Sequence, residues 1–407
     1  MKFIHLSDAH LDSPFLGLSF LPSNQFNQIK QTTEVSFKRS VDFAITDNVD
    51  LFLIAGDTFD SIHPSPKSQV FLAEQIRRLV DHKIQVVMIL GNHDYLNPED
   101  MILVDSPYFK LLGKDQKVES ASFKTKDNFE YVIHGFSYRE NHIEEDMISE
   151  FPVKVPGKYN IGLMHANEKM PSGNNVYAPF SLNELKSLNY DYFALGHIHH
   201  RQVVSEQPLV AYSGNLQGRH INEQGPKGVS LIEVDENTKQ SKITFIETAP
   251  VQWQAVTFSL KKRLSLGELL EKIAEKLNSN NDSRQLFGIN VLGSNFLTEK
   301  EIDFLQEPEA LGEISRKLKH QSLLVRIKLY TNQKLSLNDS DQIAFEKAKD
   351  KVLTREKILS LGQSLAKKDD WIAEMMQDSS FIEDVKNLTQ VKVGQKLKDF
   401  DNETNED

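Results

Sequence analysis

The chain of 407 residues exceeds one typical domain, so we expect two or three domains with cores of their own. Its 47 Lys and Arg against 58 Asp and Glu give a formal net charge of −11, which disfavours DNA binding by the whole surface. The absence of Cys excludes a disulfide scaffold, and without a signal peptide or a long apolar run we expect a cytoplasmic protein with no membrane span.

Five apolar, β-branched runs in the first half of the chain each predict a strand that ends at polar residues. The runs cover residues 3–6, 51–54, 86–90, 161–164 and 192–195. The polar groups that follow them are Asp8-Ala9-His10, Gly56-Asp57, Gly91-Asn92-His93-Asp94, His165 and Gly196-His197-Ile198-His199. Loops at strand ends can bring such side chains to one cleft.

These residue types suit a site for two divalent ions. Two ions that share one carboxylate need mixed nitrogen and oxygen ligands with an open position for water or substrate. Imidazole, carboxylate and amide oxygen supply such a shell, and without Cys they favour manganese or iron at least as much as zinc. We expect manganese. Any one of these Asp or Asn residues alone would instead be read as a turn or cap residue, but the ordered set favours metal.

Further strands at residues 228–234 and 242–246 complete the first domain, and Pro250 marks its end. The expected fold class is α/β, a sandwich of two sheets flanked by helices, over residues 1–250. A helix is expected at residues 70–80. The polar stretch at residues 114–128 is expected to lie outside the core as an excursion.

Residues 251–335 have the pattern of a small mixed α/β domain. Strands are expected at residues 256–258 and 323–327, and a helix at residues 266–277 from the spacing of its leucines and isoleucine. Thr298 and Glu301 have the spacing of a capping box and predict another helix start.

Residues 336–407 are expected to be helical and strongly charged, with apolar residues at helical spacing. These apolar faces permit two interpretations. The helices either pack onto the rest of the chain or form a docking element for a second protein.

The motifs resemble those of the calcineurin-like metallophosphoesterases, and more narrowly the DNA repair exonuclease branch that includes SbcD and bacterial YhaO proteins. The resemblance rests on the opening sequence MKFIHLSDAHLD, on Gly56-Asp57-Thr58-Phe59-Asp60 and on Tyr212-Ser213-Gly214-Asn215. It covers about the first 250 residues closely and the remainder only in outline. The second domain would correspond to a cap over the active site.

The resemblance implies two metal sites that share Asp57. One ion would be bound by Asp8, His10, Asp57 and His199, and the other by Asp57, Asn92, His165 and His197. A hydroxide formed from the shared water would attack phosphorus in line. His93 would protonate the leaving oxygen, and Asp94 would fix the orientation of its imidazole.

Four further residues are expected at the substrate. Some repair nucleases carry a phosphate-facing histidine where this chain has Asp60, and a carboxylate cannot stabilise phosphate by charge. Asp60 is therefore expected to orient a neighbouring side chain. Asn215 ends the motif that lies near the metals in the family, and Arg219 and His220 follow it, so we expect all three to touch substrate.

The function implied is a manganese-dependent exonuclease acting on DNA ends in a repair complex. The expected partners are DNA, an SbcC-like or YhaN-like SMC-type ATPase bound through the carboxyl-terminal helices, and a second copy of the chain in a homodimer. One alternative is a stand-alone phosphoesterase for nucleotides or other small phosphate esters. A third interpretation is a non-catalytic repair scaffold.

Overall fold

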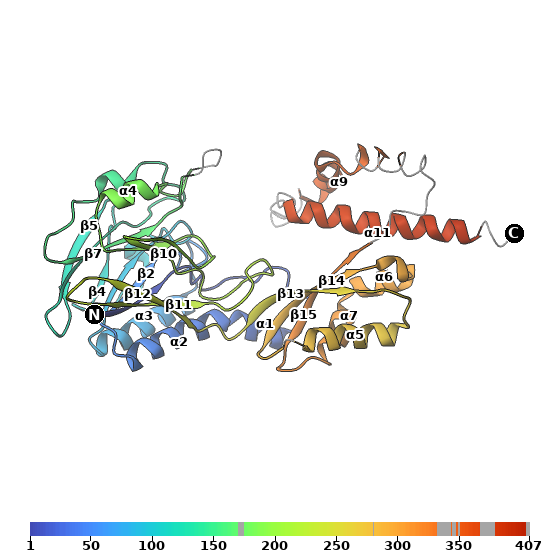
Figure 1. Ribbon diagram of the computed structural model, residues 1–407, viewed down its shortest axis with the longest axis horizontal. Coiled ribbons are helices and arrows are strands. Elements are labelled where there is room, and N and C mark those ends of the chain that lie inside the picture. Colours follow the sequence, from blue (N-terminus) through green and yellow to red (C-terminus); the bar gives the residue numbers. More distant parts are fainter. Residues whose placement is uncertain are drawn as a thin grey trace. The chain divides into compact units, whose positions relative to one another are not determined.

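The computed structural model divides the chain into two compact units, Met1–Gln252 and Trp253–Asp407 (Figure 1). It describes residues 1–169, 175–279, 281–331, 343, 347–348, 351–366 and 379–403. The further division expected near residue 335 stays a prediction. No helix among the described residues is both long enough and apolar enough to cross a membrane.

The first sheet of the amino-terminal unit has six strands in the order β12-β11-β1-β2-β3-β4. Strands β1 to β4 run parallel, whereas β11 is antiparallel to both β1 and β12. The strands are β1 (Lys2–Leu6), β2 (Leu51–Ala55), β3 (Gln85–Ile89), β4 (Phe109–Leu111), β11 (Gly228–Val234) and β12 (Ser241–Glu247). The helices beside this sheet are α1 (Ser23–Lys30), α2 (Thr32–Thr46) and α3 (Pro66–Asp81).

The second sheet has the order β5-β6-β7-β8-β10-β9, and its four central strands are parallel. The strands are β5 (Glu119–Lys124), β6 (Glu130–Gly135), β7 (Tyr159–His165), β8 (Tyr192–Gly196), β9 (Gln202–Glu206) and β10 (Leu209–Tyr212). The short helices of this unit are α4 (Leu182–Ser187), η1 (Pro98–Asp100) and η2 (Met147–Glu150). The expected two-sheet sandwich flanked by helices is confirmed.

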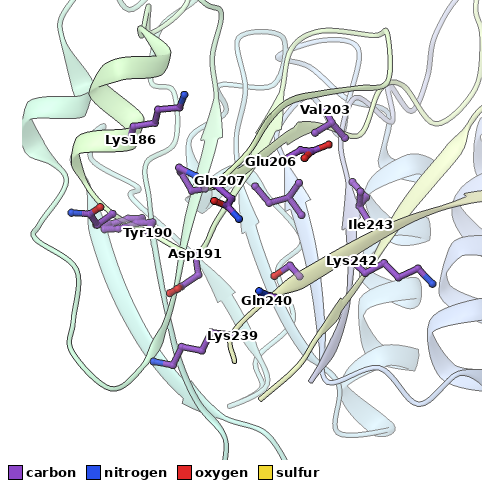
Figure 2. Close-up of a pocket in the computed structure, with 14 residues that line it drawn as sticks. Lys186, Tyr190, Asp191, Val203, Glu206, Gln207, Lys239, Gln240, Lys242 and Ile243 are labelled. Carbon is purple, nitrogen blue, oxygen red and sulfur yellow. The ribbon is translucent and has the colours of Figure 1, made fainter. Parts of the chain in front are cut away.

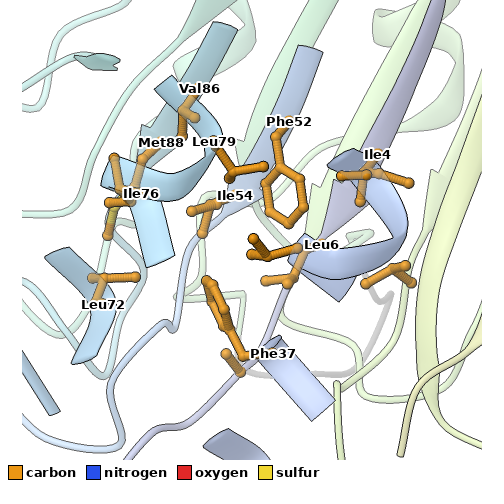
Figure 3. Packing of buried hydrophobic residues seen from close by; sticks show 14 of the residues in the cluster. Ile4, Leu6, Phe37, Phe52, Ile54, Leu72, Ile76, Leu79, Val86 and Met88 are labelled. Carbon is orange, nitrogen blue, oxygen red and sulfur yellow. The ribbon is translucent and has the colours of Figure 1, made fainter. Parts of the chain in front are cut away.

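Apolar side chains fill three layers of this unit. One cluster joins the facing sides of the two sheets and contains Phe3, Leu53 and Ile161. A second lies between the first sheet and helices α2 and α3, where Phe37 packs beside Phe52 (Figure 3). A third covers the outer side of the second sheet. Because both faces of the central strands are covered, these strands are apolar along their whole length.

Strand β5 corrects one sequence expectation. It lies within residues 114–128, which we expected to be an excursion, and pairs with β6 from Glu119 to Lys124. Its residues alternate between half-buried and exposed. An edge strand with one neighbour needs few apolar residues, so its polar composition concealed it.

The second unit contains a three-stranded sheet in the order β13-β14-β15, with β14 and β15 parallel. Its elements are β13 (Gln252–Ser259), α5 (Leu266–Asn278), β14 (Gln285–Leu292), η3 (Ser294–Phe296), α6 (Glu299–Gln306), α7 (Pro308–Ser315) and β15 (Leu323–Tyr330). The expected capping box at Thr298 and Glu301 is present and starts α6. The expected strands and helix of this region are confirmed, whereas β14 and α7 were not anticipated.

Two carboxyl-terminal helices are described, α9 (Arg355–Ala366) and α11 (Ser379–Glu403). Helix α11 packs against β15 and buries Ile382 and Val391. Lys328 pairs with Asp384, which fixes the helix at the same strand. Part of the apolar surface of this segment therefore serves internal packing, which is the first of the two interpretations. Trp371, Ile372, Met375 and Met376, which we also expected on apolar helix faces, lie outside the described residues.

Candidate metal centre

The polar loops named from the sequence come together at the carboxyl ends of parallel strands. Strands β1, β2 and β3 end at one edge of the first sheet, and β7 and β8 end at the corresponding edge of the second. Backbone hydrogen bonds join the first two loops, from Asp8 N to Gly56 O at 3.1 Å and from His10 N to Asp57 O at 3.0 Å. The expected convergence of strand ends is thus realised in the fold.

The backbone is strained where several of these residues lie. Asp8, His10, Asp57 and His197 have φ angles of 51°, 45°, 49° and 96°, in the left-handed region that residues with a Cβ atom rarely adopt. Strain of this kind costs roughly 1–3 kcal/mol per residue and gathers at functional sites. The backbone at Gly91 also passes close to this site: a Cβ there would lie 2.3 Å from Asp57 Oδ1, so the position requires glycine.

One set of candidate ligands, which we name the first ligand group, comprises Asp8, His10 and His199. The Nε2 atoms of the two imidazoles lie 3.1 Å apart. His10 Nδ1 lies 2.8 Å from Asp60 Oδ1, and His199 Nδ1 lies 2.6 Å from Glu223 Oε1. With a proton on each Nδ1, both Nε2 lone pairs point at one another, which is favourable only with a cation beside them. The geometry therefore fits a metal ion.

The second ligand group comprises Asn92, His165 and His197. Asn92 Oδ1 lies 3.0 Å from His165 Nε2 and 3.1 Å from His197 Nδ1. The carbonyl of Ala55 accepts a hydrogen bond from His165 Nδ1 at 3.0 Å, so its Nε2 faces the cluster. Nitrogen and oxygen donors converge here as a divalent ion requires.

Asp57 lies between the two groups. Its Oδ2 is 3.3 Å from His165 Nε2 and 3.8 Å from His10 Nε2, while its Oδ1 accepts from His93 N at 2.9 Å. One carboxylate oxygen thus faces ligands of both groups, as a bridging residue must. The donors fit two ions that share Asp57.

The charges of the site are coupled. Burial lowers the pKa of His10. Burial together with His165 lowers the pKa of His197 to about 4. Both imidazoles are therefore neutral and can offer a nitrogen lone pair to a metal ion. Although burial alone would lower it, the neighbouring Asp57 raises the pKa of His165 to about 9. This proton supplies the positive charge that the carboxylates attract, and a metal ion would replace it.

His93 and Asp94 follow Asn92 but take different positions. The His93 side chain is exposed, with its ring centroid 5.1 Å from that of His10. We expected Asp94 to orient this imidazole, and the structure corrects that expectation. The buried Asp94 carboxylate accepts three backbone amides instead, from Gly91 at 2.6 Å, Thr58 at 2.7 Å and Phe59 at 3.2 Å. It holds the loops after β2 and β3 together.

The pKa of Asp94 is set by opposing influences from its surroundings. Burial and the neighbouring Asp57 raise the pKa of Asp94 to about 7, although the amides of Gly91 and Phe59 oppose that shift. The side chain reaches no solvent. Its carboxylate therefore acts on the site through the backbone.

The four expected substrate residues divide into different environments. Asp60 lies beside His10 and accepts from the guanidinium of Arg219, so these two residues do reach the cluster. Asn215 is buried, and its Nδ2 donates to Gln217 O and to Glu223. This packing behind His199 makes its side chain unsuitable for direct substrate contact. His220 is half exposed and lies 3.4 Å from Glu223 Oε1.

The sequence analysis did not identify Glu223. It belongs to no ligand motif, and only its place shortly after Asn215 and His220 could have drawn notice. Although burial would raise it, hydrogen bonds with His199 and His220 hold the pKa of this carboxyl far below its usual range. A buried negative charge thus lies directly behind a candidate ligand.

A separate groove of about 820 Å³ lies at the opposite ends of the strands, where β8, β10 and β12 begin (Figure 2). Lys186, Asp191, Glu206 and Lys242 line it together with Ile243. None of its lining residues is a candidate ligand. Among the described residues, the clusters of His and Asp close enough to hold a metal ion lie instead at the carboxyl ends of the strands.

Comparison with known proteins identifies the family. The model of the calcineurin-like phosphoesterase family matches residues 1–201. A Bacillus subtilis protein described as the uncharacterized metallophosphoesterase YhaO is 35% identical over 276 residues, which cover 68% of this chain and 67% of that protein.

Two nucleases or repair proteins are more distant relatives. The DNA double-strand break repair protein Mre11 of Sulfurisphaera tokodaii is 24% identical over 325 residues, 75% of this chain and 77% of its own. The SbcD component of the nuclease SbcCD of Staphylococcus epidermidis is 23% identical over 283 residues, 62% of this chain and 71% of its own. The chain belongs to the calcineurin-like metallophosphoesterases and is similar to the branch that contains YhaO, Mre11 and SbcD.

Proposed function

We propose that the chain is a manganese-dependent exonuclease that hydrolyses phosphodiester bonds at DNA ends. The observation that carries the proposal is the meeting of two ligand groups on the shared Asp57. The similarity to Mre11 and to the SbcD component of a nuclease supports DNA as the substrate. DNA as a substrate agrees with a cytoplasmic location.

In this proposal the two ligand groups hold two ions. The first would be held by Asp8, His10, Asp57 and His199, and the second by Asp57, Asn92, His165 and His197. Such ions, when bound, lower the pKa of water and neutralise charge that develops on the phosphoryl oxygens. Carboxylate, amide and imidazole donors without thiolate suit manganese.

The remaining polar residues would prepare the site. The exposed imidazole of His93 lies beside His10, where it can donate a proton to the leaving oxygen of a substrate at the cluster. Asp60 would orient His10 through its Nδ1 atom. Asp94 would keep the loops of Asp57 and Asn92 at a fixed separation through the backbone amides that it accepts.

The proposal is tested with the full chain and three substrates: end-labelled duplex DNA, supercoiled plasmid and a small chromogenic phosphodiester. Each is incubated with manganese, with magnesium or with a chelator. We expect nucleotides to be released from the DNA ends only when manganese is present. Asp57→Ala serves as the inactive variant and the exposed Asp127→Ala as its matched control.

Two other outcomes would replace this proposal. Hydrolysis of the small diester without release of nucleotides from DNA would favour a stand-alone phosphoesterase, an alternative that the net charge of −11 supports. Two tightly bound manganese ions with no hydrolysis of any substrate would indicate a non-catalytic repair scaffold.

We further propose an SMC-type ATPase as a partner that docks on the carboxyl-terminal helices and helps an acidic nuclease to hold DNA. The supporting feature is the set of exposed apolar residues in this segment, Ile343, Val352 and Leu361, of which Leu361 in α9 is the most exposed at 82%. Ile382 of α11, by contrast, is buried against its own unit. Homodimerisation is a separate proposal, tested by sedimentation of the purified chain.

The two helices allow a discriminating test with a co-expressed SMC-type ATPase. Leu361→Glu should abolish co-purification without lowering the melting temperature, because the residue makes little internal contact. Ile382→Ala should lower the melting temperature, since large-to-small substitutions in a core cost about 2–5 kcal/mol. If Leu361→Glu still co-purifies with the ATPase, α9 is not the docking element.

A further inference from the structure

We propose that Glu223 is a positioning residue that determines the affinity of the first ligand group for its metal ion. It would do so by fixing the tautomer and orientation of His199. The inference rests on the proposed function for the presence of the ions. It concerns a residue outside every motif that the sequence analysis assigned.

Glu223 contacts the imidazole of His199 directly. Glu223 Oε1 lies 2.6 Å from His199 Nδ1, a length typical of a hydrogen bond strengthened by charge. The carboxylate is acceptor-only, so the shared proton belongs to Nδ1. The Nε2 atom then carries the free lone pair, and it is the atom that faces His10 Nε2 and Asp8 Oδ1. Glu223 therefore selects the tautomer that can bind a metal ion.

The Glu223 carboxylate is itself held in place by neighbouring donors. Its Oε2 accepts from Asn215 Nδ2 at 2.9 Å and from Arg219 N at 2.6 Å, and the side chain is only 7% exposed. Both oxygens are thus committed to protein donors. Glu223 is not itself a further ligand or a substrate contact, and its orientation leaves the His199 ring little freedom.

The segment that holds the His199 ring also holds the His199 backbone. Asn215 N donates to His199 O at 3.3 Å, and Lys227 Nζ donates to the same carbonyl at 3.0 Å. The backbone of His199 and its imidazole are therefore attached to one segment, which runs from Asn215 to Lys227. This segment supports one candidate ligand, and Glu223 is the only acidic residue between Asn215 and Lys227.

A carboxylate behind a metal-binding histidine does more than orient the ring. It increases the basicity of the imidazole, and loss of such a partner typically weakens metal affinity 10–100-fold. His165 in the second ligand group has the neutral carbonyl of Ala55 in the corresponding place. Removal of the Glu223 charge should therefore weaken one ion and spare the other.

The test measures manganese binding to the full chain by calorimetry, with Glu223→Gln as the variant. A glutamine cannot accept from His199 with one terminal atom and from Asn215 and Arg219 with the other. We expect one of two sites to weaken about 10–100-fold and the second to keep its affinity. Glu206→Gln, which removes an exposed carboxylate of the same unit, should leave both sites unchanged.

A second readout separates positioning from a purely structural role. Nitrogen NMR of the metal-free chain with labelled histidine should show the His199 proton on Nδ1, and Glu223→Gln should lose that preference. Equal weakening of both sites with a lower melting temperature would show a structural role and overturn the inference. So would unchanged affinities and an unchanged tautomer. If Glu223→Gln does not fold, Glu223→Asp is measured in the same way, with a smaller loss at the same site expected.

These results can be distinguished from failure of the proposed function. Two ions in the parent chain and selective loss of one in Glu223→Gln, without any DNA hydrolysis, would support the inference and reject the exonuclease. DNA hydrolysis with no effect of Glu223→Gln on metal binding would do the reverse.

Discussion

The two ligand groups are supported by different parts of the chain. In the second group, the Ala55 carbonyl at the end of β2 holds His165. In the first group, side-chain carboxylates hold the imidazoles, Asp60 behind His10 and Glu223 behind His199. Main-chain support cannot be removed by substitution, whereas side-chain support can. Under the proposed two-ion site, we therefore expect the affinity for one ion to be adjustable at residues that do not bind it.

The largest effect is expected where the two groups meet. Asp57→Ala removes the oxygen that faces His10 and His165 together, so activity should fall to background and both metal affinities should decrease. Metal analysis and calorimetry with manganese measure this. If Asp57→Ala keeps its full metal content, Asp57 does not bridge the groups and their division into two is wrong.

Single-group variants sharpen the comparison. His165→Ala should eliminate the ion of the second group and His10→Ala that of the first, so each variant should bind one manganese per chain instead of two. Activity should be near background in both, because the reaction needs both ions. Calorimetric stoichiometry distinguishes the two from Asp57→Ala. A variant that still binds two ions would show that its histidine is not a ligand.

The pattern of the strands was enough to predict that most of the site residues would lie close together. Asp8, Asp57 and Asn92 follow apolar runs, and parallel strands end at a common edge, so their convergence could be predicted. The same reasoning reached His165 and His197. Strand positions were sufficient for this convergence because each candidate ligand lies within a few residues of a buried strand, whereas the division into two ligand groups came from the family resemblance.

Contacts made by long loops and polar edges could not be predicted in this way. Glu223 lies eleven residues beyond the end of β10, and no periodicity relates it to His199. Asp94 turns inward to backbone amides, which leave no trace in the sequence. The alternation of polar and apolar residues in β5 is too weak to predict a strand. The sequence of a helix such as α11 shows apolar residues without showing what packs against them.

His93 offers a test in which metal binding and rate should separate. His93→Ala should retain both ions, because no ligand is removed, while the hydrolysis rate falls about 10²–10⁴-fold, the usual contribution of a general acid. Single-turnover hydrolysis and calorimetry on the same sample measure the two quantities. Loss of an ion would make His93 a ligand and would add it to the first group, whose His10 is its neighbour.

Substitution of Asp94 should lower the stability of the fold more than it lowers the rate of hydrolysis. Asp94→Asn places an amide nitrogen against backbone donors, and an unsatisfied buried donor costs about 1–3 kcal/mol. We expect a melting temperature several degrees lower and a rate loss smaller than that of His93→Ala. An unchanged melting temperature would show that the amides of Gly91, Thr58 and Phe59 find other acceptors.

The smallest effect is expected at Asp60, and its size bears on the difference between the two groups. In Asp60→Asn the side-chain oxygen can still lie beside His10 Nδ1, but the residue loses its charge and its ion pair with Arg219. Since burial of the pair is incomplete, we expect affinity for the first ion to fall about 10-fold, the low end for a residue behind a ligand. Affinity for the second ion should not change. An equal loss of affinity for the second ion would mean that the carboxylates act on the whole cluster. It would contradict the idea that each ligand group is supported only by its own neighbours.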